Sequence, residues 1–205
     1  MIKLVGHPIV DSIDIIGEKL NELTHIGETN INPYEYYYVT LHRDFNVDEP
    51  PRRDHILKEL DNISTIRRVV FAIHPRTRKR INQFGLTRHL RNIIKLKPVD
   101  YITSLSLIKH AYAVISDSGG LTKEGCILHT PCITLRPDTE WVETIDGYSN
   151  QLAFSNGNTL TKCVKRLEQN YHLAKKNLKL LEGVFGIVGV SRKIADQILI
   201  STYRD

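Results

Sequence analysis

The most chemically suggestive stretch of the sequence is residues 116–124, which read Ser-Asp-Ser-Gly-Gly-Leu-Thr-Lys-Glu. It follows a short uncharged run, 111–115, typical of a buried parallel strand, and it leads into a helical pattern. Gly119 and Gly120 would let a diphosphate approach the unpaired amides of the first helical turn, where the helix dipole favours negative charge. Glu124, one turn further on, could hold the hydroxyls of a ribose. The stretch therefore predicts a nucleotide site, with an ordinary capped strand-to-helix loop as the alternative.

Two more polar segments directly follow predicted strands. His42 and Arg43 end the aromatic and β-branched run 34–41, and Glu140 lies in the loop after the run 131–135. Because the carboxyl ends of parallel strands meet at one edge of a sheet, we expect these side chains to lie beside the glycine turn. A buried, merely hydrogen-bonded histidine is the alternative for His42. Loop solvation or helix capping is the alternative for Glu140.

The elements that must position these residues alternate between strands and helices. Strands are predicted over 2–5, 34–41, 69–73, 93–96, 111–115, 131–135 and 151–154. Helices are predicted over 10–23, 56–66, 76–84, 101–110, 158–181 and about 191–203, and from 121 onward. The polar, Asn-rich segment 24–33 is expected to be a loop. Repeated β-α units with short connections predict an α/β fold, a Rossmann-like doubly wound parallel sheet with helices on both faces.

Composition limits the classes of protein that this chain can be. With 205 residues and 41% hydrophobic content it can bury one substantial core, and we expect 1–205 to form a single domain. The apolar runs are too short to cross a bilayer and no signal-like segment follows Met1, so we expect a cytoplasmic protein without membrane contact. The three cysteines lack metal-ligand spacing, and their odd number argues against a disulfide framework. We therefore expect reduced thiols, no metal and no cofactor.

The net charge of +5 is compatible with nucleic-acid binding, but its distribution argues against it. Basic residues are interspersed with acidic ones, and the densest cluster, 76–80, has no interleaved aromatic residues. No G-x-G-x-x-G motif follows the first predicted strand, so we expect no Rossmann dinucleotide chemistry either.

Three motifs give the chain a resemblance to a known family. They are Gly6-His-Pro-Ile-Val-Asp11, Val39-Thr-Leu-His-Arg43 and the stretch 116–124. Together they resemble the non-hydrolysing UDP-N-acetylglucosamine 2-epimerases, and specifically the C-terminal, UDP-binding domain of those enzymes. Weaker matches are the loop 136–143 and the glycine-rich turn and helix 183–198. The resemblance implies one half of a two-Rossmann-domain enzyme of the GT-B type, whose closing helix, about 191–203, packs on the first domain.

The resemblance also implies roles for the polar residues. His42 would be catalytic, close to the diphosphate and the sugar, with Glu140 as an acid. The UDP phosphates would be bound by Arg43, Ser118, Gly119 and Gly120. Glu124 would hold the ribose hydroxyls. Three features depart from the family. The usual His-Arg-x-Glu-Asn motif reads His42-Arg-Asp-Phe-Asn46 here, and Ser104 stands where an aromatic residue near the uracil is common. Trp141 stands where some members have an arginine, so the resemblance implies that an arginine contact to the phosphate is lost at that position.

The implied reaction interconverts UDP-N-acetylglucosamine and its manno epimer, UDP-N-acetylmannosamine. It proceeds by elimination of UDP to a glycal and re-addition, which needs an acid/base carboxylate near the sugar. The family's N-terminal domain has no counterpart in this sequence, so we expect the nucleotide-binding half of an isomerase. It would be either a fragment or the partner of a separately encoded first domain, and it could also form a homodimer.

Two other functions fit the same residues. A GT-B glycosyltransferase uses a similar donor-binding half, and sugar turnover without an acceptor would distinguish the epimerase from it. A non-catalytic UDP-sugar-binding module is the third interpretation. Activity measured with and without a supplied N-terminal half would separate that module from an enzyme.

Overall fold

The computed structural model of the protein describes residues 2–20, 31–145 and 149–202. Their centre is a six-stranded parallel sheet in the order β3-β2-β1-β4-β5-β6. The strands are β1 (Tyr36–Leu41), β2 (Arg68–Ile73), β3 (Ile94–Leu96), β4 (Ala113–Ser116), β5 (Cys132–Thr134) and β6 (Asn150–Leu152). This is the Rossmann order, in which the chain starts at the centre and winds outward first to one side and then to the other. The predicted α/β fold with a doubly wound parallel sheet is confirmed.

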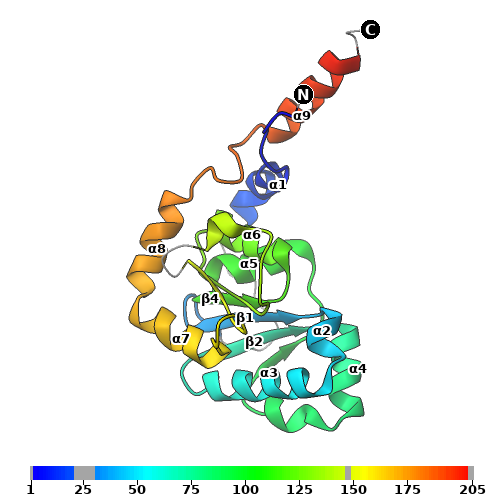
Figure 1. The fold of residues 1–205 in the computed structure, drawn as a ribbon, viewed down its shortest axis with the longest axis vertical. Coiled ribbons are helices and arrows are strands. Elements are labelled where there is room, and N and C mark those ends of the chain that lie inside the picture. The colour runs from blue at the N-terminus through cyan, green and yellow to red at the C-terminus, as the bar shows by residue number, and fades with distance from the viewer. Residues whose placement is uncertain (1, 21–30, 146–148, 203–205) are drawn as a thin grey trace.

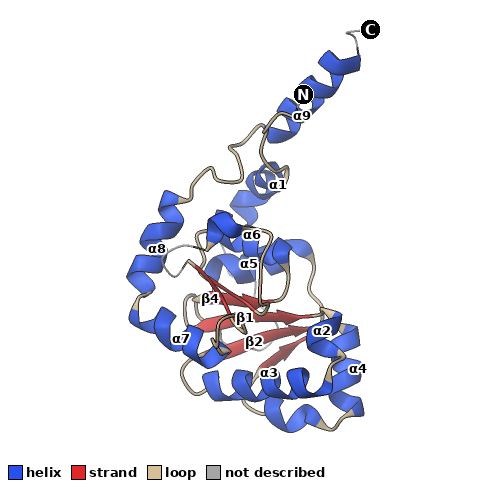
Figure 2. Ribbon diagram, viewed as in Figure 1, coloured by secondary structure: helices blue, strands red, loops and turns tan. Residues whose placement is uncertain are grey.

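Helices cover both faces of the sheet, as Figures 1 and 2 show. One core cluster contains side chains of α3 (Pro50–Ile63), the 3-10 helix η2 (Leu86–Leu90) and α7 (Leu160–Gln169). The cluster on the other face contains side chains of α1 (Ile9–Ile16), the 3-10 helix η1 (Gly17–Leu20) and α5 (Tyr101–His110). The further helices are α2 (Asp44–Val47), α4 (Pro75–Gln83), α6 (Gly119–Ile127), the 3-10 helix η3 (Val142–Thr144), α8 (Tyr171–Leu180) and α9 (Val190–Thr202).

The central strand β1 is buried on both faces because helices lie above and below it. Tyr36 and Tyr38 pack into the cluster beneath α5, whereas Tyr37 and Val39 pack into the cluster beneath α3. This alternation follows from the two-residue period of a strand. A strand without a polar face is the signature of a parallel sheet with helices on both sides. The core therefore fixes β1 and the residues that follow it.

The first predicted strand, 2–5, is wrong. These residues have no regular secondary structure, and the side chains of Ile2 and Leu4 are fully exposed. Alternating apolar residues form a strand only where a neighbouring strand completes the hydrogen bonds, and here β1 begins the sheet instead. The turn after these residues is bonded to the C-terminal part of the chain, because His7 N donates to the carbonyl of Phe185 at 2.7 Å.

Two predicted helices are shorter than expected. Instead of one helix over 10–23, α1 ends at Ile16 and continues as η1, and the prediction for 21–23, like most of the loop 24–33, lies outside the described residues. The helix predicted over 158–181 is two helices, α7 and α8. They separate at Asn170, whose φ of −126° and ψ of 24° are not helical. Asparagine competes for backbone hydrogen bonds and is a common helix terminator.

The C-terminal helix α9 projects from the body of the domain beside the N-terminal segment (Figure 1). It is anchored by Asp11 of α1, whose two carboxylate oxygens accept hydrogen bonds from Gly189 N at 2.7 Å and Ser191 N at 2.6 Å. A carboxylate at these positions caps the start of a helix and satisfies amides that have no partner within it. The helix predicted from about 191 is thus confirmed.

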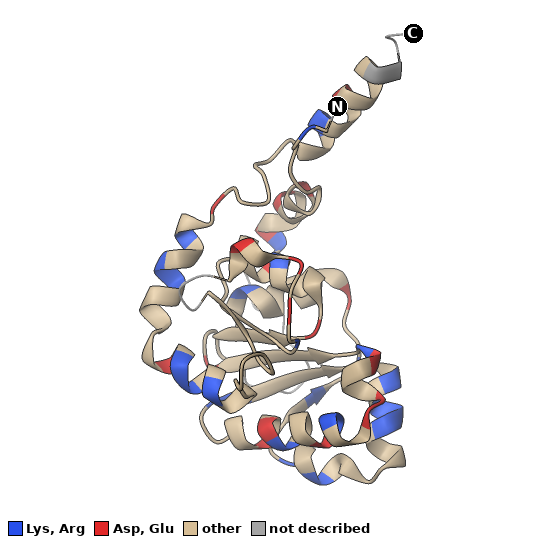
Figure 3. Ribbon diagram, in the orientation of Figure 1, with Lys and Arg blue, Asp and Glu red and all other residues tan. Residues whose placement is uncertain are grey.

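Charged side chains are distributed over several helices, including α4, α7 and α8, with Asp and Glu among the Lys and Arg (Figure 3). In the basic cluster 76–80, Arg76 and Arg80 both pair with Asp48. The expectation that this cluster does not bind nucleic acid stays a prediction. In the described part of the chain, every helix is too short or too polar to span a bilayer.

Candidate nucleotide site

The candidate site lies at the carboxyl ends of β1 and β4, which are neighbours in the sheet. The chain leaves these two strands toward opposite faces, and in doubly wound sheets the crevice between the loops at such a switch point is where ligands bind. His42 and Arg43 follow β1, and Asp117 and Ser118 follow β4. The end of β5 lies at the same edge, because Leu135 N donates to the carbonyl of Ser116 at 2.8 Å. The predicted convergence of three strand ends is confirmed.

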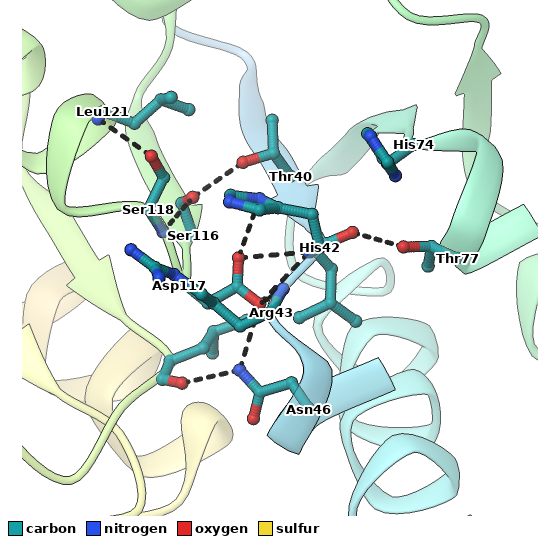
Figure 4. Close-up of polar contacts among 12 residues, drawn as sticks. Thr40, His42, Arg43, Asn46, His74, Thr77, Ser116, Asp117, Ser118 and Leu121 are labelled. Atoms are coloured by element: carbon teal, nitrogen blue, oxygen red, sulfur yellow. Dashed lines mark hydrogen bonds and ion pairs between the residues drawn. The ribbon is translucent and has the colours of Figure 1, made fainter. Parts of the chain in front are cut away.

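Asp117 joins the two loops of this crevice (Figure 4). Its buried carboxylate accepts hydrogen bonds from the backbone amides of His42 at 3.2 Å and Arg43 at 2.9 Å. Asn46 Nδ2 donates to it at 3.1 Å and also donates to the carbonyl of Leu135 at 2.9 Å. A carboxylate buried away from water needs several N–H donors to replace the hydrogen bonds that water would make, and these three groups supply them. Asp117 therefore fixes the loop after β1 against the ends of β4 and β5.

Sequence reasoning missed Asp117 as a functional residue, although it stands inside the singled-out motif. From the sequence, the serines and glycines of this motif carry the chemistry, and Asp117 is only part of a polar turn. Its position was a usable signal. A carboxylate directly after a fully buried strand must either face solvent or find several donors, and the amides of a neighbouring loop are such donors.

The His42 side chain is 37% exposed and its Nδ1 lies 3.2 Å from Asp117 Oδ1. In this orientation Nδ1–H donates to the carboxylate, as in other His–Asp pairs. A neutral His42 then presents the lone pair of Nε2, and a protonated one presents an N–H, to a bound ligand. The ring of His74 lies 6.2 Å away, centroid to centroid, at the end of β2. His42 is thus an oriented group and not a buried structural histidine.

The turn after β4 leads directly into the capped start of helix α6. Ser118 is the N-cap of α6, since its Oγ accepts from Leu121 N at 3.4 Å, and its own amide donates to Ser116 Oγ at 3.0 Å. Helix α6 begins at Gly119, two residues earlier than predicted. Within the described ranges, no hydrogen bond engages the amides of Gly119 and Gly120. Two free amides and the positive end of the helix dipole are suited to an anionic oxygen.

Glu140 lies over this helix start and pairs with Arg136, whose Nη1 is 2.8 Å from Oε2. A Cβ placed on Gly119 would come 3.0 Å from Glu140 Oε1. A hydrogen bond with its own backbone amide and the charges of Arg136 and Arg43 lower the pKa of Glu140. In this arrangement Glu140 is a carboxylate, which suits a proton acceptor or a charge better than a proton donor.

Glu124 lies deeper than the other predicted site residues and is only 7% exposed. Burial raises its pKa, and a hydrogen bond from the Tyr101 hydroxyl and the charge of Lys123 offset part of that effect. Partial burial of the Tyr101 hydroxyl and the charge of the nearby Glu124 carboxylate raise the pKa of Tyr101 to about 12. Ser104, one turn along α5, has its hydroxyl 3.1 Å from that of Tyr38. Glu124 therefore faces the first turn of α5, and its role toward a ribose stays a prediction.

Comparison with known proteins agrees with this geometry. The family model described as UDP-N-acetylglucosamine 2-epimerase matches residues 1–199. A protein of that name from Methanococcus maripaludis is 40% identical over 180 residues, covering 83% of this chain and 49% of the relative. Another from Methanocaldococcus jannaschii is 38% identical, covering 79% of this chain and 46% of the relative. The chain thus spans about half the length of the curated relatives it matches.

A solved structure shows the same fold. The crystal structure of the M. jannaschii UDP-GlcNAc 2-epimerase in complex with UDP-GlcNAc and UDP superposes with a TM-score of 0.79 at 32% identity. The match covers 97% of this chain and 54% of that one. The described residues therefore share the fold of about half of that enzyme.

Proposed function

Because the chain belongs to the UDP-N-acetylglucosamine 2-epimerase family, we propose that it is the nucleotide-sugar-binding half of such an isomerase. The observation that carries this proposal is the crevice between β1 and β4, where Asp117 holds His42 beside the free amides of Gly119 and Gly120. A positively polarised helix start next to an oriented histidine is suited to a diphosphate attached to a sugar. The related M. jannaschii enzyme carries UDP-GlcNAc and UDP in its crystal structure.

Each site residue has a part in this proposal. The diphosphate is bound by Ser118, Gly119, Gly120 and Arg43. The ribose hydroxyls donate hydrogen bonds to the carboxylate of Glu124. These bonds would replace part of the hydrogen bonding to water that the carboxylate loses on burial. His42 contacts the phosphate nearest the sugar through Nε2. Glu140, which is paired with Arg136 in the chain without ligand, is the acid/base carboxylate that this half would contribute to the reaction.

In the proposed reaction a base removes the proton from C2 of the sugar while the C1–O bond breaks. UDP leaves with the electron pair of that bond, and the sugar remains as a glycal. UDP then adds back to C1, and C2 takes a proton on the opposite face. The contribution of this chain is to stabilise the departing diphosphate by fixed amides, the helix dipole and His42, which act where negative charge develops.

The rest of the machinery belongs to a second half, which we propose packs against α9. Leu199 and Ile200 of that helix are about half exposed, and Ile187 and Val188 in the preceding loop are more than half exposed. Apolar side chains gathered on a projecting element are typical of a covered surface. The second half would be a separate polypeptide or another part of a longer chain, while a homodimer stays a prediction. We place the protein in the cytoplasm, where its three free, buried cysteines stay reduced.

A calorimetric titration with UDP, UDP-N-acetylglucosamine and ADP tests this proposal. We expect the two uridine ligands to bind and ADP to bind at least tenfold more weakly. His42→Ala should weaken UDP binding about tenfold, by the loss of one charge-assisted hydrogen bond. Asp14→Asn, at an exposed carboxylate of α1, should bind as the parent does. A folded chain that binds neither uridine ligand would refute the proposal.

A further inference from the structure

Trp141 is the single tryptophan of the chain and lies against the first residue of α6. A Cβ built on Gly119 would come 3.1 Å from the indole Nε1 and 3.0 Å from Glu140 Oε1. The indole edge that carries the N–H and the carboxylate therefore meet over one point at the start of the helix. A side chain at position 119 would crowd both groups, and glycine leaves them room.

The orientation of the Trp141 ring is fixed from several sides. The ring of His7 packs edge-on at 6.2 Å and that of Phe185 edge-on at 5.6 Å, centroid to centroid. Lys123 Nζ lies 4.3 Å from the indole centroid and 2.8 Å from His7 Nε2. A ring packed in this way keeps its N–H directed at the start of α6.

That N–H has no acceptor among the described residues, although the Nε1 atom is buried. A buried indole N–H normally finds a hydrogen-bond partner, because leaving one unsatisfied is costly. The neighbouring carboxylate of Glu140 is engaged with Arg136 instead. An acceptor supplied by a ligand would satisfy the indole and the free amides of Gly119 and Gly120 together.

We propose that Trp141 donates its indole N–H to a phosphate oxygen of the bound nucleoside diphosphate, making it a specificity-determining residue for the diphosphate. The phosphate oxygen replaces the Glu140 carboxylate over Gly119. The Glu140 side chain is 47% exposed, so its carboxylate can move toward solvent when the phosphate binds, at the cost of its hydrogen bonds to Arg136. The inference rests on the proposed function, since it needs UDP in the same crevice.

Nuclear magnetic resonance tests this directly, because a chain with one tryptophan gives a single indole N–H resonance in ¹⁵N-labelled protein. We expect UDP to move this resonance downfield, as a charge-assisted hydrogen bond forms. Uridine, which has no phosphate, should move backbone resonances near Glu124 and leave the indole resonance in place. If UDP moves backbone resonances of Gly119 and Gly120 but not the indole, the inference is wrong and the proposed function stands.

Two variants sharpen the test. Trp141→Phe keeps an aromatic ring and removes the N–H, and it should weaken UDP binding about tenfold. Val142→Ala, at a 67% exposed neighbour in the same loop, should bind UDP as the parent does. An indole resonance that responds to Glu140→Gln but not to UDP would assign the N–H to Glu140 and overturn the inference. If no resonance of the chain moves with UDP, the proposed function fails and this inference fails with it.

Discussion

Asp117 is the residue on which the geometry of the crevice depends. Its fully buried carboxylate holds the amides of His42 and Arg43 and the amide group of Asn46. Asp117→Asn would place an N–H₂ group against these donors. We expect the free energy of unfolding to fall by about 3 kcal/mol, since buried donors lose their acceptor.

Urea unfolding of Asp117→Asn and the parent measures this change. The exposed carboxylate of Asp14 provides the matched control, and Asp14→Asn should change stability by less than about 0.5 kcal/mol. Calorimetry at a temperature where the variant is still folded should also show weakened UDP binding. An Asp117→Asn protein as stable as the parent would show that the carboxylate is not needed to hold the loop.

The Glu124 carboxylate is expected to lower the stability of the fold, although it binds the ligand. Burial raises its pKa above the value in the unfolded chain, so the ionised carboxylate is unfavourable in the fold at pH values above its folded pKa. Glu124→Gln should therefore raise the free energy of unfolding at pH 7 and weaken UDP binding about tenfold. The stability gain should vanish below about pH 4, where glutamate is protonated in the unfolded chain as well.

Denaturant unfolding at pH 7 and pH 4, together with UDP calorimetry, measures both effects. Glu182→Gln, at a 66% exposed side chain, is the control and should leave UDP binding unchanged. A loss of stability at pH 7 in Glu124→Gln would contradict the argument from burial.

Among the elements, α6 is held against β5 by a close contact at Gly125. A Cβ at this position would lie 2.5 Å from Cys132 Sγ and 3.2 Å from the carbonyl oxygen of Thr130. Gly125→Ala should therefore lower the free energy of unfolding by about 1–3 kcal/mol through overpacking, even though alanine favours a helix. Adding Cys132→Ala should restore part of the loss.

The control for this prediction is Gly17→Ala. Gly17 has a helical φ of −53°, and a Cβ there would meet nothing within 4 Å. This substitution should stabilise the protein by about 0.5–1 kcal/mol, the usual gain when a glycine becomes alanine in helical backbone. Unfolding curves of Gly125→Ala, Cys132→Ala and the double variant complete a double-mutant cycle with the parent. A stabilised Gly125→Ala variant would contradict the contact.

The anchoring of α9 depends on pH through Asp11. Hydrogen bonds from the hydroxyl and amide of Ser191 and from the amide of Gly189 lower the pKa of Asp11 to about 2, against an ordinary 3.8. Because the folded pKa is depressed, the cap stabilises α9 fully above about pH 4, and its contribution is lost as the pH falls through 2. Asp11→Asn should remove this dependence.

Hydrogen exchange measures the effect at the cap itself. In Asp11→Asn the amides of Gly189 and Ser191 should exchange faster than in the parent at pH 7, while amides of β1 should be unaffected. Equal protection of these two amides in both proteins would show that Asp11 does not hold the helix start.

At the scale of the whole molecule, we expect the chain alone to bind UDP-N-acetylglucosamine without epimerising it. Closing a cleft between two domains normally brings acid and base groups to the sugar and excludes water. Incubation in D₂O followed by proton NMR would report both epimer formation and exchange at C2. Adding the complementary half of the M. maripaludis relative as a separate polypeptide should restore turnover. Epimerisation or exchange by the chain alone would contradict this expectation.

The sequence by itself determined the alternation of elements and the place of the phosphate turn. Helix α5 has the predicted bounds, and the bounds of β1 and β2 differ from the predicted ones by one or two residues. These elements are predictable because a strand or helix that packs on the core has apolar residues at a regular spacing in the sequence. The glycine pair of α6 was equally visible, since a close backbone approach requires that residue type.

Only the tertiary structure decided which residues act together. The bonds of Asp117 to His42 span 75 positions of sequence, and no local pattern records a partner so distant. Ile2, Leu4 and Val5 fit a strand pattern, but among the described residues no strand pairs with them. Trp141 and Glu140 meet over Gly119 because β4 and β5 are adjacent in the sheet. Periodicity encodes burial, whereas partners are set by the packing of the whole sheet.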